Sequence, residues 1–276
     1  MDQLLNERTI LLSNNQVGPR LHIATLRSPS IAQNVLPGQF VHMRICGMDD
    51  HILRRPFSIF DSNPEEGTID ILYQVVGYGT NHLSMLSPET MPEEWSIELV
   101  GPVGTTWKAY KDIQIGQRPK ALLVGGGVGA APLFLLAKEL KRAQCEFDVV
   151  IGAQTEDALV TLDRYKTLLG YEPFCATDDG SYGFSGFCTL LANERLEQGT
   201  SQSDSRYDYV AVCGPTPVMK IVAGYAMEHD VACEVSMEKR MACGIGACLS
   251  CVVDTVDGKK RSCVDGPVFD ARKVIW

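Results

Sequence analysis

The sequence predicts three consecutive units: an antiparallel β-barrel domain, an α/β nucleotide-binding domain with a parallel sheet, and a small cysteine-rich C-terminal segment. Between residues 7 and 104, apolar and polar residues alternate in short runs separated by proline and glycine, as they do in antiparallel strands. From about residue 118, strand-like apolar runs alternate with helix-like runs, which predicts repeated βα units. We therefore place the domains at residues 1–112, 113–232 and 233–276.

The expected barrel strands are clearest at residues 21–25, 41–45 and 69–75, where apolar side chains occupy every second position. A polar stretch at 111–118 is expected to join the first two domains, and the polar run at 198–206 is expected to be a solvated surface loop. The expected strands and helices of the α/β domain are, in chain order, 120–124, 131–142, 147–151, 157–169, 173–177, 187–196, 207–213 and 217–228.

Four cysteines near the C-terminus form the most informative pattern of the chain. They have the spacing C-x4-C-x2-C-x11-C, which is the plant-ferredoxin order of [2Fe–2S] ligands, whereas zinc sites usually pair cysteines in two C-x2-C strings. Gly244 and Gly246 lie between the first two cysteines, where a loop around a cluster needs positive φ and inward N–H groups. We predict a [2Fe–2S] cluster bound by Cys243, Cys248, Cys251 and Cys263.

A hairpin is expected to return the fourth cysteine to the first three. Val252, Val253 and Thr255 read as a strand that leads to Asp257-Gly258, a strong hairpin signal. The six other cysteines of the chain stand singly in apolar runs, as buried free thiols do in a reducing compartment. These features predict a cytoplasmic protein.

Composition and charge exclude several classes of protein. The chain has 276 residues, of which 45% are hydrophobic and 21% charged, which suits about two globular domains. The net charge of -9, without runs of Lys or Arg, argues against nucleic acid or an anionic membrane as the main partner. The N-terminus lacks the features of a signal peptide. The apolar run 121–137 is interrupted by four glycines and a proline, so no membrane span is expected.

The string Arg-Arg-Pro-Phe-Ser at 54–58 is a candidate flavin site. An arginine beside a backbone fixed by proline can face pyrophosphate oxygens, and the following hydroxyl can reach the isoalloxazine ring. Alone, such a string would most often be an exposed basic loop. Tyr73 could stack on the flavin or simply belong to the strand core, and Gly-Tyr-Gly-Thr at 77–80 precedes an apparent helix start suited to phosphate.

A glycine-rich string at 125–129 follows an expected strand and precedes an expected helix, an arrangement that lets the backbone approach a dinucleotide pyrophosphate. The next strand ends at Gly-Ala-Gln without the ribose-binding acid of an ordinary Rossmann site. A second string at the end of a later strand could face the nicotinamide. Tight packing alone is the alternative for both. The candidate nucleotide-binding residues are Gly125, Gly126, Gly127, Gly129, Cys213, Gly214 and Pro215.

The order of these motifs, with Gly-Pro-Val-Gly at 101–104 between them, resembles the ferredoxin–NAD(P)H reductase superfamily across about residues 10–230. Three strings narrow the resemblance: Thr-Asp-Asp-Gly-Ser at 177–181, the run from Met237 to Cys248, and Cys-Val-Asp-Gly-Pro-Val-Phe at 263–269. They resemble the electron-transfer subunits of dihydroorotate dehydrogenase B, a resemblance that covers nearly the whole chain.

The resemblance implies FAD in the barrel, NAD on the α/β domain and a [2Fe–2S] cluster in the C-terminal segment. It also implies a separate FMN-containing catalytic subunit, in a heterotetramer of two copies of each chain, that supplies electrons from dihydroorotate in pyrimidine biosynthesis. No acid or base for dihydroorotate oxidation is expected in this chain. Position 74 is Gln where the family usually carries Arg. The implied FAD contacts are Arg55, Pro56, Phe57, Ser58, Leu72, Tyr73, Gln74, Gly79 and Thr80.

NAD is favoured over NADP because residues 152–157 offer carboxylates and no arginine for a 2′-phosphate. Two alternatives stay open. The first is a related reductase subunit that serves a hydrogenase or an NADH-dependent ferredoxin:NADP+ oxidoreductase. The second is a non-catalytic binding module in which the four cysteines hold structural zinc.

Overall fold

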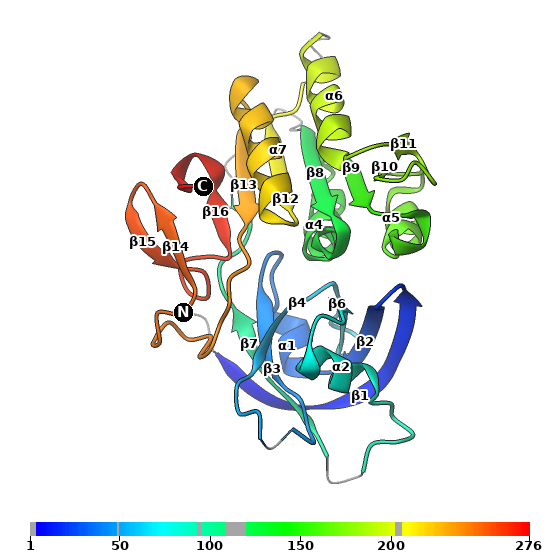
Figure 1. Cartoon of the computed structure of the whole chain (residues 1–276), viewed down its shortest axis with the longest axis vertical. Coiled ribbons are helices and arrows are strands. Elements are labelled where there is room, and N and C mark those ends of the chain that lie inside the picture. Colours follow the sequence, from blue (N-terminus) through cyan, green and yellow to red (C-terminus); the bar gives the residue numbers. More distant parts are fainter. Residues whose placement is uncertain (1–3, 49, 93–94, 109–119, 202–205) are drawn as a thin grey trace.

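The computed structural model describes residues 4–48, 50–92, 95–108, 120–201 and 206–276 (Figure 1). Its described part contains two seven-stranded sheets, one in each half of the molecule, and a separate two-stranded hairpin. The predicted combination of an antiparallel barrel-like sheet with a parallel α/β sheet is confirmed. The expected linker at 111–118 and the boundary 112/113 lie outside the described residues.

The first sheet is an antiparallel half-barrel with the strand order β4-β3-β7-β1-β2-β6-β5. Alternate residues of its strands, such as Ile69, Ile71 and Tyr73 in β6, point inward and are buried in one apolar core. Its strands and helices are β1 (Leu5–Gly18), β2 (Leu21–Arg27), α1 (Pro29–Asn34), β3 (Phe40–Arg44), β4 (Arg55–Ser58), β5 (Asp61–Asn63), β6 (Thr68–Gln74), α2 (Tyr78–Ser84) and β7 (Ile97–Val103).

The second sheet has the strand order β11-β10-β9-β8-β12-β13-β16, and all its pairs are parallel except β13 with β16. Its strands are β8 (Lys120–Gly126), β9 (Glu146–Ala153), β10 (Phe174–Thr177), β11 (Phe184–Ser185), β12 (Tyr209–Cys213), β13 (Ala232–Ser236) and β16 (Val268–Asp270). Its helices are η1 (Gly127–Leu133), α4 (Phe134–Arg142), η2 (Glu156–Ala158), α5 (Leu162–Leu169), α6 (Cys188–Ser201), α7 (Thr216–Glu228) and η3 (Ala271–Lys273).

Helices cover both faces of this parallel sheet, as repeated βα units require. In β8, Leu123 packs in the core that contains side chains of α4 and α5, whereas Leu122 packs in the core that contains side chains of α6 and α7. The strand is therefore apolar on both faces, which explains its continuous apolar sequence. Within the described residues, no helix has both the length and the apolar character needed to cross a bilayer.

Several elements differ from the sequence-based expectations. The expected helix at 157–169 is the 3₁₀ segment η2 followed by the separate helix α5. Helix α6 continues to Ser201, so the first part of the expected loop 198–206 extends a packed helix instead of leaving it. The expected helix at 131–142 is a 3₁₀ segment, η1, followed by α4, because Pro132 cannot donate a backbone hydrogen bond. Strand β13 begins at Ala232 and pairs with β12, so the proposed boundary 232/233 falls within this strand.

The C-terminal tail, defined here as residues 237–276, folds back on both sheets (Figure 1). The predicted hairpin is present: β14 (Val252–Thr255) pairs with β15 (Gly258–Arg261) around the expected turn. Strand β16 then joins the edge of the parallel sheet beside β13. Since Thr105 N also donates a 2.6 Å hydrogen bond to Gly266 O, the tail contacts the half-barrel as well.

The two large sheets are also joined by aromatic packing. Phe60, next to β5, and Leu72 on β6 belong to the same apolar core as α4 and α5. The rings of Phe60 and Phe134 lie 5.1 Å apart, and Phe134 meets Tyr165 edge to face at 5.1 Å. Leu72 points to this interface because its neighbour Tyr73 points into the half-barrel.

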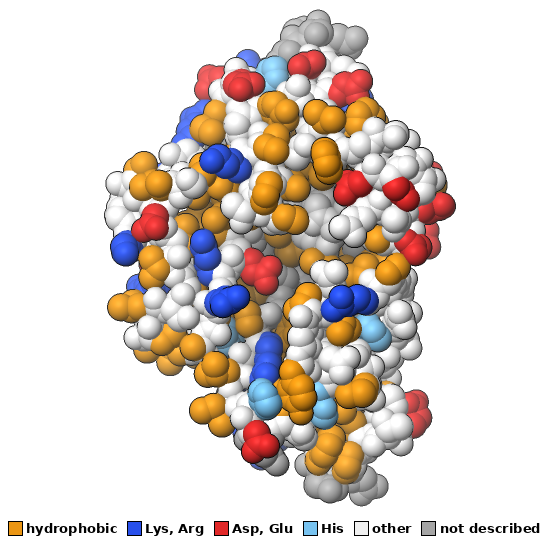
Figure 2. All heavy atoms as spheres, viewed as in Figure 1, with side chains coloured by type: hydrophobic (Ala, Val, Ile, Leu, Met, Phe, Trp, Pro, Cys, Tyr) orange, Lys and Arg blue, Asp and Glu red, His pale blue; other side chains and the backbone are white. Residues whose placement is uncertain are grey.

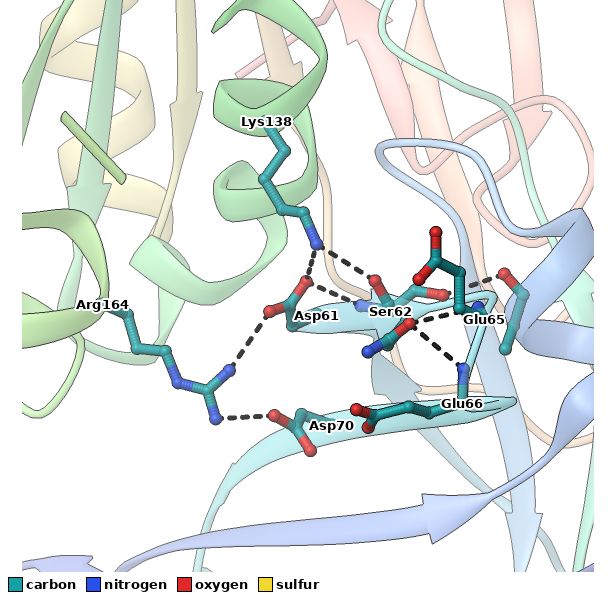
Figure 3. A network of polar contacts seen from close by, with 9 residues as sticks. Asp61, Ser62, Glu65, Glu66, Asp70, Lys138 and Arg164 are labelled. Atoms are coloured by element: carbon teal, nitrogen blue, oxygen red, sulfur yellow. Dashed lines mark hydrogen bonds and ion pairs between the residues drawn. The ribbon is translucent and has the colours of Figure 1, made fainter. Parts of the chain in front are cut away.

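A network of ion pairs lies beside this apolar contact (Figure 3). Arg164 from α5 reaches Asp61 at 3.2 Å and Asp70 at 2.6 Å, and Lys138 from α4 reaches Asp61 at 2.6 Å. Thr25 donates a 2.6 Å hydrogen bond to the other oxygen of Asp70. Two cations of the α/β domain therefore neutralise two carboxylates of the half-barrel, and the pairs fix the relative orientation of the domains.

Replacement of Arg164 by alanine should lower the free energy of unfolding by about 1–2 kcal/mol, because Asp61 and Asp70 then lose their shared partner at a half-buried interface. Urea unfolding measures this change. Arg142→Ala is the matched control: within the described part of the chain, Arg142 pairs only with Glu139, on the exposed face of the same domain, so a loss under about 0.5 kcal/mol is expected. Equal losses for both variants would contradict the role of Arg164.

Candidate functional site

The four predicted cluster cysteines lie in the tail, on a loop at 243–251 and just after β15. Cys251 and Cys263 are buried with their sulfur atoms 3.3 Å apart, well beyond the ~2.05 Å of a disulfide. A tetrahedral metal with metal–sulfur bonds of about 2.3 Å holds two thiolates roughly 3.8 Å apart. The spacing of this pair therefore suits two thiolates on one metal atom.

The other two cysteines form a second pair. Cys248 N donates a 3.4 Å hydrogen bond to the sulfur of Cys243. Burial alone would raise the pKa of the Cys243 thiol, but hydrogen bonds from the N–H groups of Ile245, Cys248 and Ala247 lower this pKa to about 6. The thiolate form of Cys243, which is the form that binds metal, is therefore favoured at neutral pH.

The backbone of the cysteine loop (residues 243–251) has the predicted conformation. Gly244 and Gly246 have φ values of +70° and +81°, and Leu249 also has a positive φ of 57°. Such turns direct successive N–H groups toward one side of the loop, as the bonds to Cys243 show. The donor set and this N–H cradle fit an iron–sulfur cluster.

The structure brings the cysteines together as two pairs and not as four ligands at one point. Among the described residues, no group of three or more His, Cys, Asp or Glu side chains has the geometry of a metal site. Cys248 is exposed, whereas Cys251 and Cys263 are buried.

Side chains of the half-barrel pack against one side of the cysteine loop and form what we call its floor. Phe40 on β3 and Val103 on β7 pack with Cys251 and Cys263 in one apolar cluster. His42, two residues after Phe40, lies with its Nε2 3.5 Å from the sulfur of Met241. Burial, with a smaller effect of the nearby Arg54 charge, lowers the pKa of His42 to about 4, so its ring is neutral at pH 7.

The candidate flavin residues fall into two groups, of which the first is brought together at the open edge of the half-barrel. The guanidinium of Arg55 approaches Gly79 so closely that a Cβ there would lie 2.6 Å from Nε. Thr80 Oγ1 accepts hydrogen bonds from Val76 N and Gly77 N at 2.9 and 3.2 Å. Strand β4 and the start of α2 therefore meet, as the two motifs predict.

The second group lies inside the sheet. Tyr73 is 3% exposed, stacks on His22 at 5.5 Å and donates a 2.9 Å hydrogen bond to Asn14. Burial raises its pKa to about 12. Phe57 meets Tyr73 edge to face at 5.9 Å. These positions match the strand-core interpretation of Tyr73. Leu72 is buried toward the α/β domain and Gln74 is exposed, and the contacts of all these residues with FAD stay a prediction.

The two candidate nucleotide motifs meet at the carboxyl edge of the parallel sheet, where such sheets bind ligands. Gly125 and Cys213 are paired in register. A Cβ on Gly129 would lie 2.4 Å from the carbonyl oxygen of Cys213, and one on Gly126 would lie 3.3 Å from Pro215. These glycines permit close packing of the two turns, and their part in binding a dinucleotide stays a prediction.

Cys213 and Ser181 are two further residues near this edge. Cys213 is buried, and burial raises the pKa of its thiol to about 12, so its backbone and not its sulfur lies at the edge. Ser181 accepts a 2.8 Å hydrogen bond from Glu156 N, which holds the acidic turn after β9 beside the turn after β10. The carboxylates from which NAD was predicted over NADP are therefore at the same end of the sheet.

Sequence reasoning did not identify Phe40 and His42 as part of the site. They lie about 200 residues before the cysteine loop in the sequence, and the fold brings them into contact with it. Their alternation with Val41 and Met43 was visible, but it indicates only that one side of β3 differs from the other. No local signal could have shown what covers that side.

Comparisons with known proteins agree with this geometry. A family model described as the iron-sulfur cluster binding domain of dihydroorotate dehydrogenase B matches residues 238–275. The chain is 35% identical over 270 residues to "Dihydroorotate dehydrogenase B (NAD(+)), electron transfer subunit" of Desulforamulus reducens, covering 96% of this chain and 97% of that protein. It is 34% identical over 267 residues to the protein of the same name from Bacillus pumilus, covering 96% of each.

Two solved structures show similar folds. A chain from the structure of NADH-dependent reduced ferredoxin-NADP oxidoreductase superposes with a TM-score of 0.81 and 31% identity, over 98% of this chain and 90% of that chain. A ferredoxin NADP+ reductase from Neisseria gonorrhoeae with bound FAD and NADP has a TM-score of 0.64 at 15% identity, over 83% and 92%. The second likeness concerns the fold alone.

Gly129→Ala should destabilise the protein by about 1–3 kcal/mol and weaken NADH binding, because the new Cβ would lie 2.4 Å from the carbonyl of Cys213 and force the two motifs apart. Urea unfolding and NADH fluorescence titration measure both effects. Gly224→Ala, on α7 with nothing within 4 Å of the new Cβ, should instead stabilise by about 0.5–1 kcal/mol. Unchanged stability of Gly129→Ala would show that the two turns are loosely packed.

Proposed function

We propose a function that starts from family membership: this chain belongs to the electron transfer subunits of dihydroorotate dehydrogenase B. In this proposal the chain receives electrons from an FMN-containing subunit that oxidises dihydroorotate. It passes these electrons to NAD+, in pyrimidine biosynthesis. The observation that supports it best is the cysteine loop, with its thiolate-forming hydrogen bonds, packed on a half-barrel that is itself joined to a parallel sheet.

The chain has an iron–sulfur cluster binding domain, and we infer that the cluster is [2Fe–2S]. Its proposed ligands are Cys243, Cys248, Cys251 and Cys263, because their spacing is that of plant-type ferredoxins. The N–H groups around Cys243 would also stabilise negative charge on the cluster sulfurs. Structural zinc is the competing occupant, and its usual two-knuckle spacing is not the spacing of this chain.

FAD is proposed to bind along β4 and the start of α2. Arg55 supplies a guanidinium for pyrophosphate, and the closely packed Gly79 keeps the backbone of α2 next to that charge. Ser58, at the end of β4, would hydrogen-bond the ring system. With Gln at position 74, Arg55 is the charge on which pyrophosphate binding would chiefly depend.

NAD is proposed to lie on the carboxyl edge formed by the turns after β8 and β12. The backbone of Gly127 is open, with nothing within 4 Å of where a Cβ would stand, so a pyrophosphate can approach it. Glu156 and Asp157 at the start of η2 would repel a 2′-phosphate and accept hydrogen bonds from ribose hydroxyls. The residues of this chain thus bind and orient both nucleotides.

The order of the cofactors has a chemical reason. When bound, a flavin exchanges two electrons with nicotinamide and single electrons with an iron–sulfur cluster. Dihydroorotate gives up two electrons and two protons to become orotate, and NAD+ takes up two electrons and one proton. The proposed division of labour leaves the acid–base chemistry of dihydroorotate to the partner, and this chain supplies only binding and electron transfer.

The proposed partner surface is the exposed side of the cysteine loop. Ile245 and Leu249 are 55% and 63% exposed, and Figure 2 shows hydrophobic side chains with Lys and Arg along the side where Figure 1 places the tail. Specific interfaces have an apolar core with a polar rim, and Arg is enriched in them. Met241, two residues before the loop, packs with Phe40 and Val103 of the half-barrel and is therefore not part of this surface.

Cys248→Ser should abolish cluster assembly, because one of four ligands is lost. Protein purified without oxygen should contain about two iron and two sulfide per wild-type chain and neither in the variant. NADH oxidation by an artificial acceptor should be largely kept, since the flavin and nucleotide residues are untouched. One zinc and no sulfide in the wild type would reject the cluster, and loss of both activities would show that the loop is needed for the FAD site.

Ile245→Glu should reduce dihydroorotate:NAD+ activity reconstituted with the FMN subunit, because a charge replaces an exposed apolar contact beside the cluster. The affinity of the two subunits measures the cause. Val256→Glu is the matched control, at the far turn of the β14–β15 hairpin and 66% exposed, and should leave the activity unchanged. If the wild type neither binds nor couples to that subunit but reduces a ferredoxin, it is instead a subunit like that of the similar oxidoreductase structure.

A further inference from the structure

The start of the cysteine loop packs on one ring of the half-barrel, the imidazole of His42. This residue is in the middle of β3, and its ring is fully buried. A Cβ built on Gly244 would lie 2.6 Å from Cδ2 and 2.7 Å from Nε2 of the ring. The ring also touches Met241, whose sulfur is 3.5 Å from Nε2. Residues on both sides of Cys243 therefore contact one imidazole.

We propose that His42 is a positioning residue: its ring is the seat of the cysteine loop and sets the distance between the cluster and the flavin-binding strands. The inference rests on the proposed function, because it needs a cluster in the loop. It goes beyond that function in assigning a role to a residue outside the cysteine motif and outside the flavin motif.

The register of the half-barrel connects this seat to the flavin residues. His42 is paired with Pro56, and Phe40 is paired with Ser58, in the antiparallel β3–β4 ladder. Paired residues of neighbouring strands point to the same face of a sheet and lie only about 5 Å apart. The two residues beneath the cysteine loop and two proposed FAD contacts thus share one continuous face.

A missing hydrogen bond indicates that His42 is not there to stabilise the half-barrel. Its Nδ1 is buried and has no hydrogen-bond partner in the described part of the chain. A buried polar atom without a partner is unfavourable, and an apolar ring of the same size would avoid that cost. What the ring does in this structure is fill the space against Gly244 and Met241.

Gly244 has a close neighbour on the loop that serves as an internal comparison. Gly244 and Gly246 both have positive φ, and in both a Cβ would lie 2.6 Å from another side chain. For Gly244 the obstacle is His42 on the half-barrel, whereas for Gly246 it is Val264 within the tail itself. Alanine at either position therefore brings a similar backbone strain but a different clash.

A double-mutant cycle on the complete holoprotein tests the seat. Gly244→Ala and Gly246→Ala should each speed the loss of iron to a chelator, followed by the visible absorbance and by iron and sulfide per chain. In a His42→Ala background, the effect of Gly244→Ala should shrink by about threefold or more, because the clash is removed and only strain remains. Gly246→Ala should speed the loss of iron by the same factor in both backgrounds. An unchanged factor for Gly244→Ala overturns the inference.

Electron transfer gives the second readout. In single-turnover reduction by NADH, His42→Ala should leave FAD reduction unchanged, slow cluster reduction about fivefold or more and alter the electron paramagnetic resonance spectrum of the cluster. His42→Phe keeps a ring of similar size and should restore both. Failure of phenylalanine to rescue would reject a steric seat. A wild-type chain without iron would reject the proposed function itself, whereas an iron-loaded chain with purely multiplicative effects rejects only the role of His42.

Discussion

The packing of the C-terminal tail on β3 of the half-barrel is the constraint on which the candidate site depends. Phe40 and His42 form the floor under the cysteine loop, and Thr105 holds the tail through the 2.6 Å bond to Gly266. A short loop rich in glycine has little core of its own. The cysteines are therefore held in place by side chains that lie about 200 residues earlier in the sequence.

The same principle, close approach through glycine, organises the nucleotide edge. The turns after β8 and β12 touch because Gly129 lies under the carbonyl of Cys213 and Gly214 lies against Gly126. Parallel register puts both turns at one end of the sheet. The two strings therefore form one contiguous edge, where we propose that NAD binds, and the acidic turn at Glu156 lies at the same end.

Local sequence patterns predicted the fold well, and they failed where distant contacts decide. Period-two alternation and repeated βα units gave both sheets, and Asp257-Gly258 gave the tail hairpin. The end of α6 was misplaced because Gln, Gly, Thr and Ser resemble a loop but here extend a packed helix. Tyr73 could not be assigned between flavin and core, because its partners Asn14 and His22 lie on other strands. His42 was not predicted for the same reason.

Three contacts link the three units in a closed ring. Arg164 and Lys138 join the α/β domain to the half-barrel, β16 joins the tail to the α/β domain beside β13, and His42 joins the half-barrel to the tail. In a closed ring, each contact limits the motion that the other two would allow. Electron transfer between neighbouring cofactors requires short, fixed separations, and this arrangement would hold the three proposed sites in such a relation.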